Sequence, residues 1–174
     1  MHESRMLIDG KLVEGQAGVF ANINPATETV IGEVSDASAA DMHRAIEAAR
    51  RAFDETDWSV DRKFRQRCLL QLQEALESEK EELREELIAE AGCPRAITHG
   101  PQLDAPLSDG LTYPAALIDD YAWDTDLGDA LVSVTGMNTR RRVWREPVGV
   151  VGAIVPWNFP FEVTIHKLGQ ALAT

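Results

Sequence analysis

The feature that most constrains this chain is a short apolar run, residues 147–160, that prolines interrupt. It reads Pro-Val-Gly-Val-Val-Gly-Ala-Ile-Val-Pro-Trp-Asn-Phe-Pro. Its β-branched residues predict a strand over residues 148–155 that is covered on both faces, as in a parallel α/β sheet. Pro156 and Pro160 have no amide hydrogen to donate to a neighbouring strand, so the predicted strand ends there.

Trp157, Asn158 and Phe159 lie between these two prolines, at the carboxyl end of the predicted strand. Open α/β sheets place their ligands outside this edge. From Phe161 onward, apolar residues recur at helical spacing and predict a helix. An Asn at such a tip fits simple turn chemistry as well as a functional site, so the spacing alone leaves both interpretations open.

Residues 146–160 together with His-Lys-Leu-Gly-Gln-Ala-Leu-Ala-Thr at 166–174 carry a family resemblance. The string resembles the segment that opens the cofactor-binding sheet of the NAD(P)-dependent aldehyde dehydrogenase superfamily. The similarity extends back through Asn24-Pro25-Ala26-Thr27 to Leu7-Ile8-Asp9-Gly10, and it covers the amino-terminal third or so of a family member. The resemblance implies an α/β fold of three layers (α/β/α) with a Rossmann-like cofactor domain. Only the amino-terminal part would be present here, with a helical layer and a β-arm.

The same resemblance implies three regions. Residues 1–130 would form the amino-terminal part of the cofactor-binding domain, a β-hairpin plus helices. Residues 131–147 would form an oligomerisation β-hairpin arm, and residues 148–174 the first strand and helix of the cofactor-binding sheet. An arm of this kind implies a homodimer or homotetramer in the full-length form.

The implied activity is oxidation of an aldehyde to a carboxylic acid through a cysteine thiohemiacetal, with NAD or NADP as cofactor. Asn158 matches the family Asn whose side-chain amide stabilises the oxyanion, and losing one such donor typically costs ~3 kcal/mol. Lys167 matches a Lys near the active site that is associated with proton relay or support, although a plain surface lysine is the alternative. The residues that match the lining of the cofactor's path are Ile154, Val155, Pro156, Trp157 and Asn158.

The two cysteines of the sequence both lie outside the context of the family's nucleophile. Cys68 belongs to a helical apolar pattern, and Cys93 has neither a helix N-terminus nor a His beside it to activate a thiol. The family's nucleophilic Cys, general-base Glu, phosphate loop and ribose-binding Lys have no match in the 174 residues. We therefore expect a fragment that is inactive alone. The alternatives are a non-catalytic interaction module that docks onto full-length subunits, or a branch of the superfamily that makes acyl-CoA or reduces an acyl phosphate.

Composition excludes several other classes of protein. The net charge of −12 argues against nucleic-acid binding, which requires a basic patch. No apolar run approaches the ~20 residues that span a bilayer. Residues 1–5 do not begin a signal peptide, so a cytoplasmic protein is expected. The four histidines lack metal-ligand spacing, so no metal site is expected, and Glu162 and His166 are interpreted as helix-surface residues.

Local signals predict the remaining elements. An Asp-Gly turn predicts a hairpin over residues 6–13, and a brief strand is expected at 30–34. Ser38 with Asp41 forms a capping box. Ser59 is expected to cap a second helix, and residues 78–81 form another capping box that predicts a bend or a new helix, which ends at Gly92.

Prolines interrupt the helical pattern of residues 100–125. Pro114 inside a helix would cost about 3 kcal/mol, so a kink or a break is expected there. Residues 124–129 are expected to form a turn. Residues 131–135 and 141–145 are expected to form strands around a turn at 136–139. The run Arg140–Arg142 fits either anion binding or the alternation of an exposed edge strand.

Overall fold

The computed structural model describes residues 4–132 and 134–174. The expectations for residues 1–3 and for Ser133 therefore lie outside the described residues. In chain order the elements are β1 (Met6–Ile8), β2 (Lys11–Val13), β3 (Gly18–Ile23), β4 (Val30–Asp36), α1 (Ala39–Glu55), the 3₁₀ turn η1 (Asp57–Ser59), α2 (Arg62–Ser78), α3 (Lys80–Ala91), α4 (Arg95–Thr98), α5 (Asp104–Asp109), α6 (Thr112–Asp120), β5 (Asp124–Val132), β6 (Met137–Trp144) and α7 (Pro160–Ala173).

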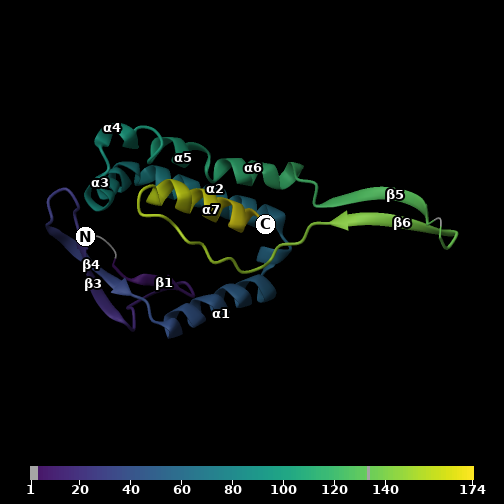
Figure 1. Cartoon of the computed structure of the whole chain (residues 1–174), viewed down its shortest axis with the longest axis horizontal. Helices are drawn as coiled ribbons and strands as arrows, with labels where there is room; N and C mark the ends of the chain where they lie inside the picture. Colours follow the sequence, from purple (N-terminus) through teal and green to yellow (C-terminus); the bar gives the residue numbers. More distant parts are fainter. Residues whose placement is uncertain (1–3, 133) are drawn as a thin grey trace.

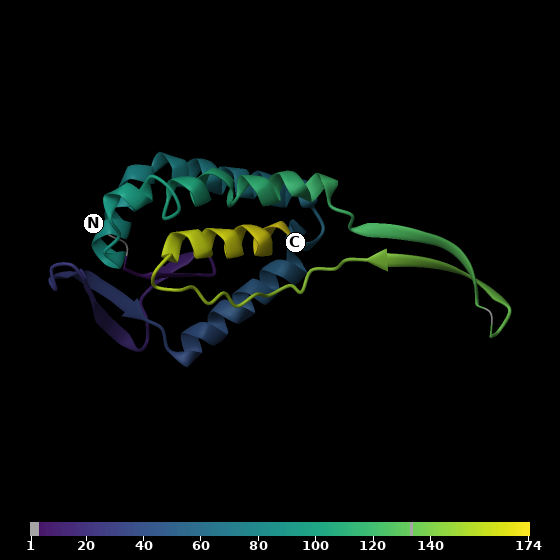
Figure 2. The ribbon, with the colours of Figure 1, turned by 45° about the horizontal axis from the view of Figure 1, so that its top comes forward.

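The elements form a helical layer, a second group around α1, and a projecting arm (Figure 1). Helices α2 to α6 lie along one side with α7 beside them, and α1 lies on the other side with the hairpins β1–β2 and β3–β4. The hairpin β5–β6 extends away from both groups, as Figure 2 also shows. The mixture of helix and strand, with a helical layer and a β-arm, agrees with the predicted fold class.

The first hairpin has the predicted Asp-Gly turn. Asp9 and Gly10 have φ values of 55° and 70°, which a two-residue turn of type I′ requires. The strand predicted at residues 30–34 is β4, and it pairs antiparallel with β3. Strand β3 has no counterpart in the sequence-based predictions.

Helix α1 begins with the predicted capping box. The Ser38 side chain accepts the amide of Asp41, and the Asp41 carboxylate accepts the amide of Ser38 at 2.8 Å. The prediction that Ser59 caps the second helix is wrong, because Ser59 ends η1 and Asp61 accepts the amide of Phe64 at 2.9 Å. Asp61 has the extended backbone of an N-cap and the acceptor that the first turn needs.

The helix break predicted at residues 78–81 is confirmed, but the second capping box does not form. Ser78 Oγ donates to the carbonyl of Ala75 at 2.7 Å, and α3 begins without a side-chain cap. Gly92 ends α3 in the left-handed conformation, as predicted. The predicted interruption after residue 100 is also confirmed: Pro106 and Pro114 each stand third in a new short helix. Helix amides in the first turn have no intrahelical acceptor, so proline is tolerated there.

The hydrophobic core lies where α7 meets α2, α5 and α6. One buried cluster contains Leu69, Leu111, Ala115, Ile118, Ile165 and Ala173. A second contains Leu87, Leu103 and Leu107, and Phe161 at the start of α7 packs against it. Two glycines bring α7 close to its neighbours, since a Cβ on Gly169 would lie 2.2 Å from the carbonyl oxygen of Gly110.

The prediction of a buried strand at residues 148–155 is wrong for the described structure. The connection between β6 and α7 has neither strand nor helix, and Val148 and Ile154 are 80% and 90% exposed. Each sheet within residues 4–132 and 134–174 is a two-stranded antiparallel hairpin, so no strand pairs with this connection. A parallel strand needs neighbours on its edges, and without them its backbone groups are left to water.

The arm β5–β6 is longer than predicted. Residues 124–129 were expected to form a turn, and instead they belong to β5 and pair with β6. The pairing passes from Asp126 opposite Arg142 to Gly128 opposite Arg141, so Leu127 is a bulge without a partner. The side chains of Arg142 and Arg140 bind Asp124 and Asp126. Two members of the arginine run are thus paired across the ribbon.

Candidate functional site

Asn158 lies in the exposed bend that immediately precedes α7. Pro160 occupies the first position of this helix, where its fixed φ and missing amide are both tolerated. The backbone carbonyl of Asn158 accepts a hydrogen bond of 2.7 Å from Gln102 Nε2. Within residues 4–132 and 134–174, its side-chain amide has no hydrogen-bond partner. The backbone of Asn158 is therefore anchored, while its amide N–H groups are available to another molecule.

The side chains of the four residues before Asn158 are mostly exposed to solvent, as a binding surface requires. Ile154 is 90% exposed and Trp157 is 86% exposed. Val155 is also exposed, and Pro156 is half-buried. These side chains stay on the surface of the connection, so they are accessible to a ligand or to further protein.

Lys167 lines a groove of about 400 Å³ between α1, the connection and α7. The α1 side of this groove includes Ala49 and Ala52, and Trp58 of η1 closes one part of it. None of Ile154–Asn158 lines the groove, so the structure does not bring Lys167 together with Asn158. The groove is nevertheless continuous with the predicted cofactor segment, because Gly149 to Val151 and Ala153 form its wall.

Arg50 of α1 contacts the connection from this side. The ideal Cβ position of Gly149 lies 2.5 Å from Arg50 Nη1, and Gly149 has a φ of +92°. A side chain at residue 149 would both clash and strain the backbone. Arg50 also binds Asp54 in the next turn of α1 at 2.8 Å. The Arg50 guanidinium thus occupies space that a side chain at residue 149 would fill, so this position requires glycine.

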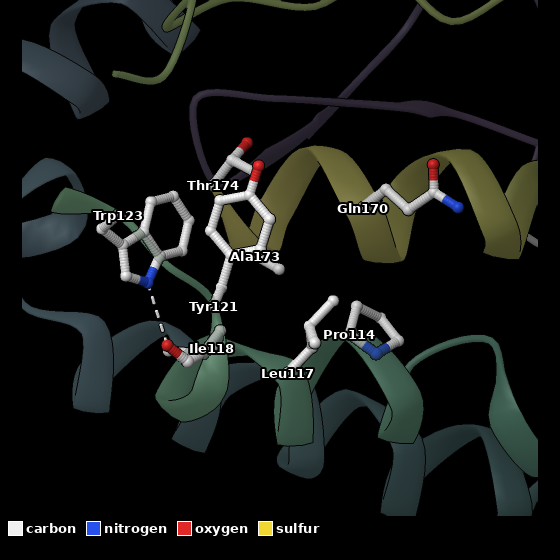
Figure 3. Close-up of a pocket in the computed structure, with 8 residues that line it drawn as sticks. All are labelled: Pro114, Leu117, Ile118, Tyr121, Trp123, Gln170, Ala173 and Thr174. Atoms are coloured by element: carbon white, nitrogen blue, oxygen red, sulfur yellow. Dashed lines mark hydrogen bonds between the residues drawn. The ribbon is translucent and has the colours of Figure 1, made fainter. Parts of the chain in front are cut away.

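A small apolar pocket lies at the opposite end of α7 (Figure 3). Its volume is about 160 Å³, and Tyr121 and Trp123 contribute aromatic faces. The Trp123 indole N–H donates to the Ile118 carbonyl at 3.0 Å. Because α7 has 14 residues, the pocket is about 20 Å along the helix axis from Asn158, so it is not part of the same site.

Neither cysteine has the surroundings of a nucleophile. Cys93 is 5% exposed, and burial raises the pKa of its thiol above the ordinary value. A raised pKa disfavours the thiolate, which is the reactive form. Cys68 is half-buried in α2. The surroundings of Cys93 thus disfavour a reactive thiol at that position.

Glu162 and His166 lie on α7, as expected, but they are not fully solvated. Glu162 is half-buried, and His166 Nε2 lies 3.6 Å from Asp109 of α5. The described part of the chain contains no group of three or more His, Cys, Asp or Glu residues that could hold a metal ion. Among the described helices, none has the length and apolar character required to cross a membrane.

Sequence reasoning missed Gln102, the residue that contacts the backbone of Asn158. Gln102 is 3% exposed and lies in the turn between α4 and α5. Its bond to Asn158 joins residues 56 positions apart in the chain. A glutamine among prolines and glycines has no pattern that predicts such a partner, so the sequence held no signal for it.

Comparison with known proteins places this arrangement in a family. A model described as "Aldehyde dehydrogenase family" matches residues 12–174. The NADP/NAD-dependent aldehyde dehydrogenase PuuC of Escherichia coli is 33% identical over 98% of this chain, which corresponds to 33% of PuuC. The aminoacetaldehyde dehydrogenase of Pseudomonas aeruginosa is 36% identical over 97% of this chain, again 33% of the relative.

Solved structures give the same result for the fold. The aldehyde dehydrogenase of Mycobacterium tuberculosis, solved with NAD+, superposes with a TM-score of 0.86 and 30% identity. This match covers 98% of this chain and 34% of that structure. The chain spans about a third of the length of the relatives it matches. It belongs to the aldehyde dehydrogenase family.

Proposed function

We propose that this chain supplies the oxyanion-binding amide and part of the cofactor-binding surface of an enzyme that oxidises an aldehyde to a carboxylic acid with NAD or NADP. The observation that carries the proposal is that Asn158 combines an anchored backbone with an exposed side-chain amide. Its backbone carbonyl is held by Gln102, and its exposed side-chain amide, in the bend before α7, has no hydrogen-bond partner among the residues that the structure describes. The anchored backbone sets the position from which this donor projects, and a donor positioned before the reaction is what stabilisation of a developing oxyanion requires.

The cofactor-binding part of the proposal rests on the connection before Asn158. The exposed apolar side chains of Ile154, Val155 and Trp157 are open to a planar ring system, and Pro156 limits the backbone freedom between them. Residues 154–158 would hold the nicotinamide, which would supply the acceptor for the hydride that leaves the substrate. Lys167 faces a groove beside residues 149–153 and would act there as a positive charge next to the connection, apart from Asn158.

The chemistry assigned to this chain is limited to binding and charge stabilisation. The amide N–H groups of Asn158 would donate to the substrate oxygen as it gains negative charge. We infer that neither Cys68 nor Cys93 is the nucleophile, because Cys93 is buried with a raised thiol pKa and Cys68 belongs to the apolar pattern of helix α2. We therefore expect the 174 residues alone to oxidise no aldehyde.

The test uses a hybrid enzyme in which residues 1–174 replace the corresponding part of E. coli PuuC. In the hybrid, Asn158→Ala should lower kcat for aldehyde oxidation by about 10²–10³-fold, the usual cost of one oxyanion donor. Gln170→Ala is the matched control, since Gln170 is an exposed amide on α7, the helix that Asn158 precedes. An Asn158→Ala hybrid with the kcat of the parent would refute the proposed role.

A second candidate function has its own support in the arm. The ribbon β5–β6 has exposed apolar side chains, including Leu131 at 67% and Met137 at 60%. An isolated two-stranded ribbon is marginal in water, so a partner surface would explain its length. The chain would then act as an interaction module that joins full-length subunits of a homodimer or homotetramer.

The two candidates make different predictions about assembly. As a module, the 174-residue chain should co-sediment with full-length subunits of its own family, and Met137→Glu should abolish this. Asn158→Ala should leave the association unchanged. The cytoplasmic location expected from the sequence stays a prediction under either candidate.

A further inference from the structure

We propose that Gln102 is a positioning residue for Asn158, and that Arg84 holds Gln102 in place. The inference deepens the proposed function and rests on it, because it concerns how the oxyanion-binding amide is aimed. It is carried by hydrogen bonds that join buried Arg84 of α3 to both ends of the turn at residues 98–104, and Gln102 in that turn to the exposed bend before α7.

The first link is the bond between Gln102 Nε2 and the carbonyl of Asn158, at 2.7 Å. Phe159 is the N-cap of α7, and its carbonyl accepts the amide of Val163 at 3.1 Å. Asn158 precedes this N-cap, so no amide of the helix is available to its carbonyl. Gln102 supplies the donor that the helix cannot.

The second link fixes the turn that carries Gln102. Arg84 is 1% exposed and binds both ends of this turn. Its Nη1 donates to Thr98 Oγ1 at 2.8 Å, and its Nη2 donates to Asp104 Oδ1 at 2.7 Å. Thr98 ends α4 and Asp104 begins α5, so one planar guanidinium spans the segment between them.

Backbone bonds and apolar contacts make the same turn rigid. The amide of Gln102 donates to the Ile97 carbonyl at 3.2 Å. Leu103, the next residue, is fully buried in the cluster against which Phe161 packs. The bend at Asn158 is therefore attached to the turn by a polar contact and, three residues later, by an apolar one.

The two halves of the Gln102 amide are used differently. Its Nε2 donates to Asn158, whereas its Oε1 is buried without a hydrogen-bond partner within the described residues. A carbonyl oxygen can only accept, so the donor half is the one that acts on Asn158. Gln102→Glu would place a carboxylate oxygen against that carbonyl, and Gln102→Met would remove the donor without adding charge.

Gln73 provides a control of the same chemistry elsewhere. Its Nε2 donates to the Leu107 carbonyl at 2.6 Å, and its Oε1 is likewise buried without a partner. Gln73 connects α2 to α5, and among the described residues no hydrogen bond joins it to the bend before α7. Substitutions at Gln73 should therefore affect stability without affecting the direction of the Asn158 amide.

The first experiment measures hydrogen exchange in the 174-residue chain, which requires no activity. Gln102→Glu and Gln102→Met should accelerate exchange of the backbone amides at residues 163–166, the first of α7 that have acceptors within the helix, by at least about tenfold, whereas the same two substitutions at Gln73 should not. Unchanged exchange at 163–166 in both Gln102 variants would overturn the inference.

The second experiment uses the hybrid with PuuC. A misplacement of about 1 Å can cost on the order of 10²-fold in rate, so Gln102→Met should lower kcat by up to that factor and leave KM within about twofold. Gln73→Met should lower the melting temperature but keep kcat. Equal kcat values for the two Met variants would overturn the inference. If Asn158→Ala has no effect in the same hybrid, the proposed function fails, and the exchange measurement alone decides whether Gln102 positions the bend.

Discussion

The connection between β6 and α7 is followed directly in the chain by helix α7, and both contain many apolar side chains. In α7, Ile165, Gly169 and Ala173 are buried against α2, α5 and α6. In the connection, Val148, Ile154 and Trp157 are 80%, 90% and 86% exposed. A helix satisfies its own backbone hydrogen bonds and then needs only one apolar face to be covered. A parallel strand needs partners for its backbone before its side chains can be buried.

The largest expected effect comes from creating a cavity in the core against which α7 packs. Leu111 is fully buried beside Ile165 of α7. Leu111→Ala should lower the free energy of unfolding by about 2–5 kcal/mol, through lost transfer energy and the cavity that remains. The matched change in the connection, Ile154→Ala, should stay within about 0.5 kcal/mol because that side chain is already in water. Urea denaturation of the 174-residue chain measures both, and equal effects would break the comparison.

A glycine pair gives the next largest effect. A Cβ at residue 169 would lie 2.2 Å from the Gly110 carbonyl oxygen, a backbone atom, so the helices would have to separate. Gly169→Ala should cost about 1–3 kcal/mol. Gly152 of the connection has nothing within 4 Å of its ideal Cβ and serves as the control. Urea denaturation should give a stability for Gly152→Ala at or above that of the parent, and a destabilised Gly152→Ala would mean that the connection is packed in solution.

The smallest effect concerns an ion pair on the surface of the helical layer. Lys63 of α2 lies 2.7 Å from Asp119 of α6. The hydrogen bond from Lys63, and then that from Gln66, holds the Asp119 pKa below its ordinary value of 3.8. A carboxyl whose pKa is lower in the folded state stabilises the fold above its unfolded pKa, and the contribution is lost as the pH falls through the folded pKa.

Asp119→Asn should therefore be slightly less stable than the parent at pH 7, and the difference should shrink as the pH falls below 3.8. It should also shrink in high salt, because exposed ion pairs are screened. Thermal melts at pH 7 and at a pH below 3.8, with Asp120→Asn as the neighbouring control, measure the difference in stability. A gap that grows on acidification would contradict the assigned cause.

Local signals in the sequence predicted much of the fold. The turn at Asp9-Gly10, the capping box of Ser38 with Asp41 and the end of α3 at Gly92 each depend on residues a few positions apart. Such interactions form wherever the local backbone allows them, so their patterns can be read without knowledge of distant partners.

The errors arose where distant or competing partners decide the structure. The strand at 148–155 was predicted from its β-branched residues, but β propensity describes fit to a sheet that must be built by other segments. Ser59 and Asp61 both had the chemistry of an N-cap, and only the backbone at Asp61 selected between them. At the candidate site, the position of Asn158 before a helix was predictable. Its anchor Gln102 was not, because that bond depends on how α4 and α5 turn.

The bulge at Leu127 determines where the arm can tolerate a change in length. Before the bulge, Asp124 and Asp126 lie opposite Trp144 and Arg142. After it, Asp129 lies opposite Arg140. The face of β5 that carries even-numbered side chains before the bulge therefore carries odd-numbered side chains after it. Deleting Leu127 alone would remove the unpaired residue and keep every other side chain on its present face. Deleting Ala130 instead would turn the side chains between Leu127 and Ala130 to the opposite face of the strand. Among natural relatives, single-residue length differences in this strand should therefore collect at the bulge.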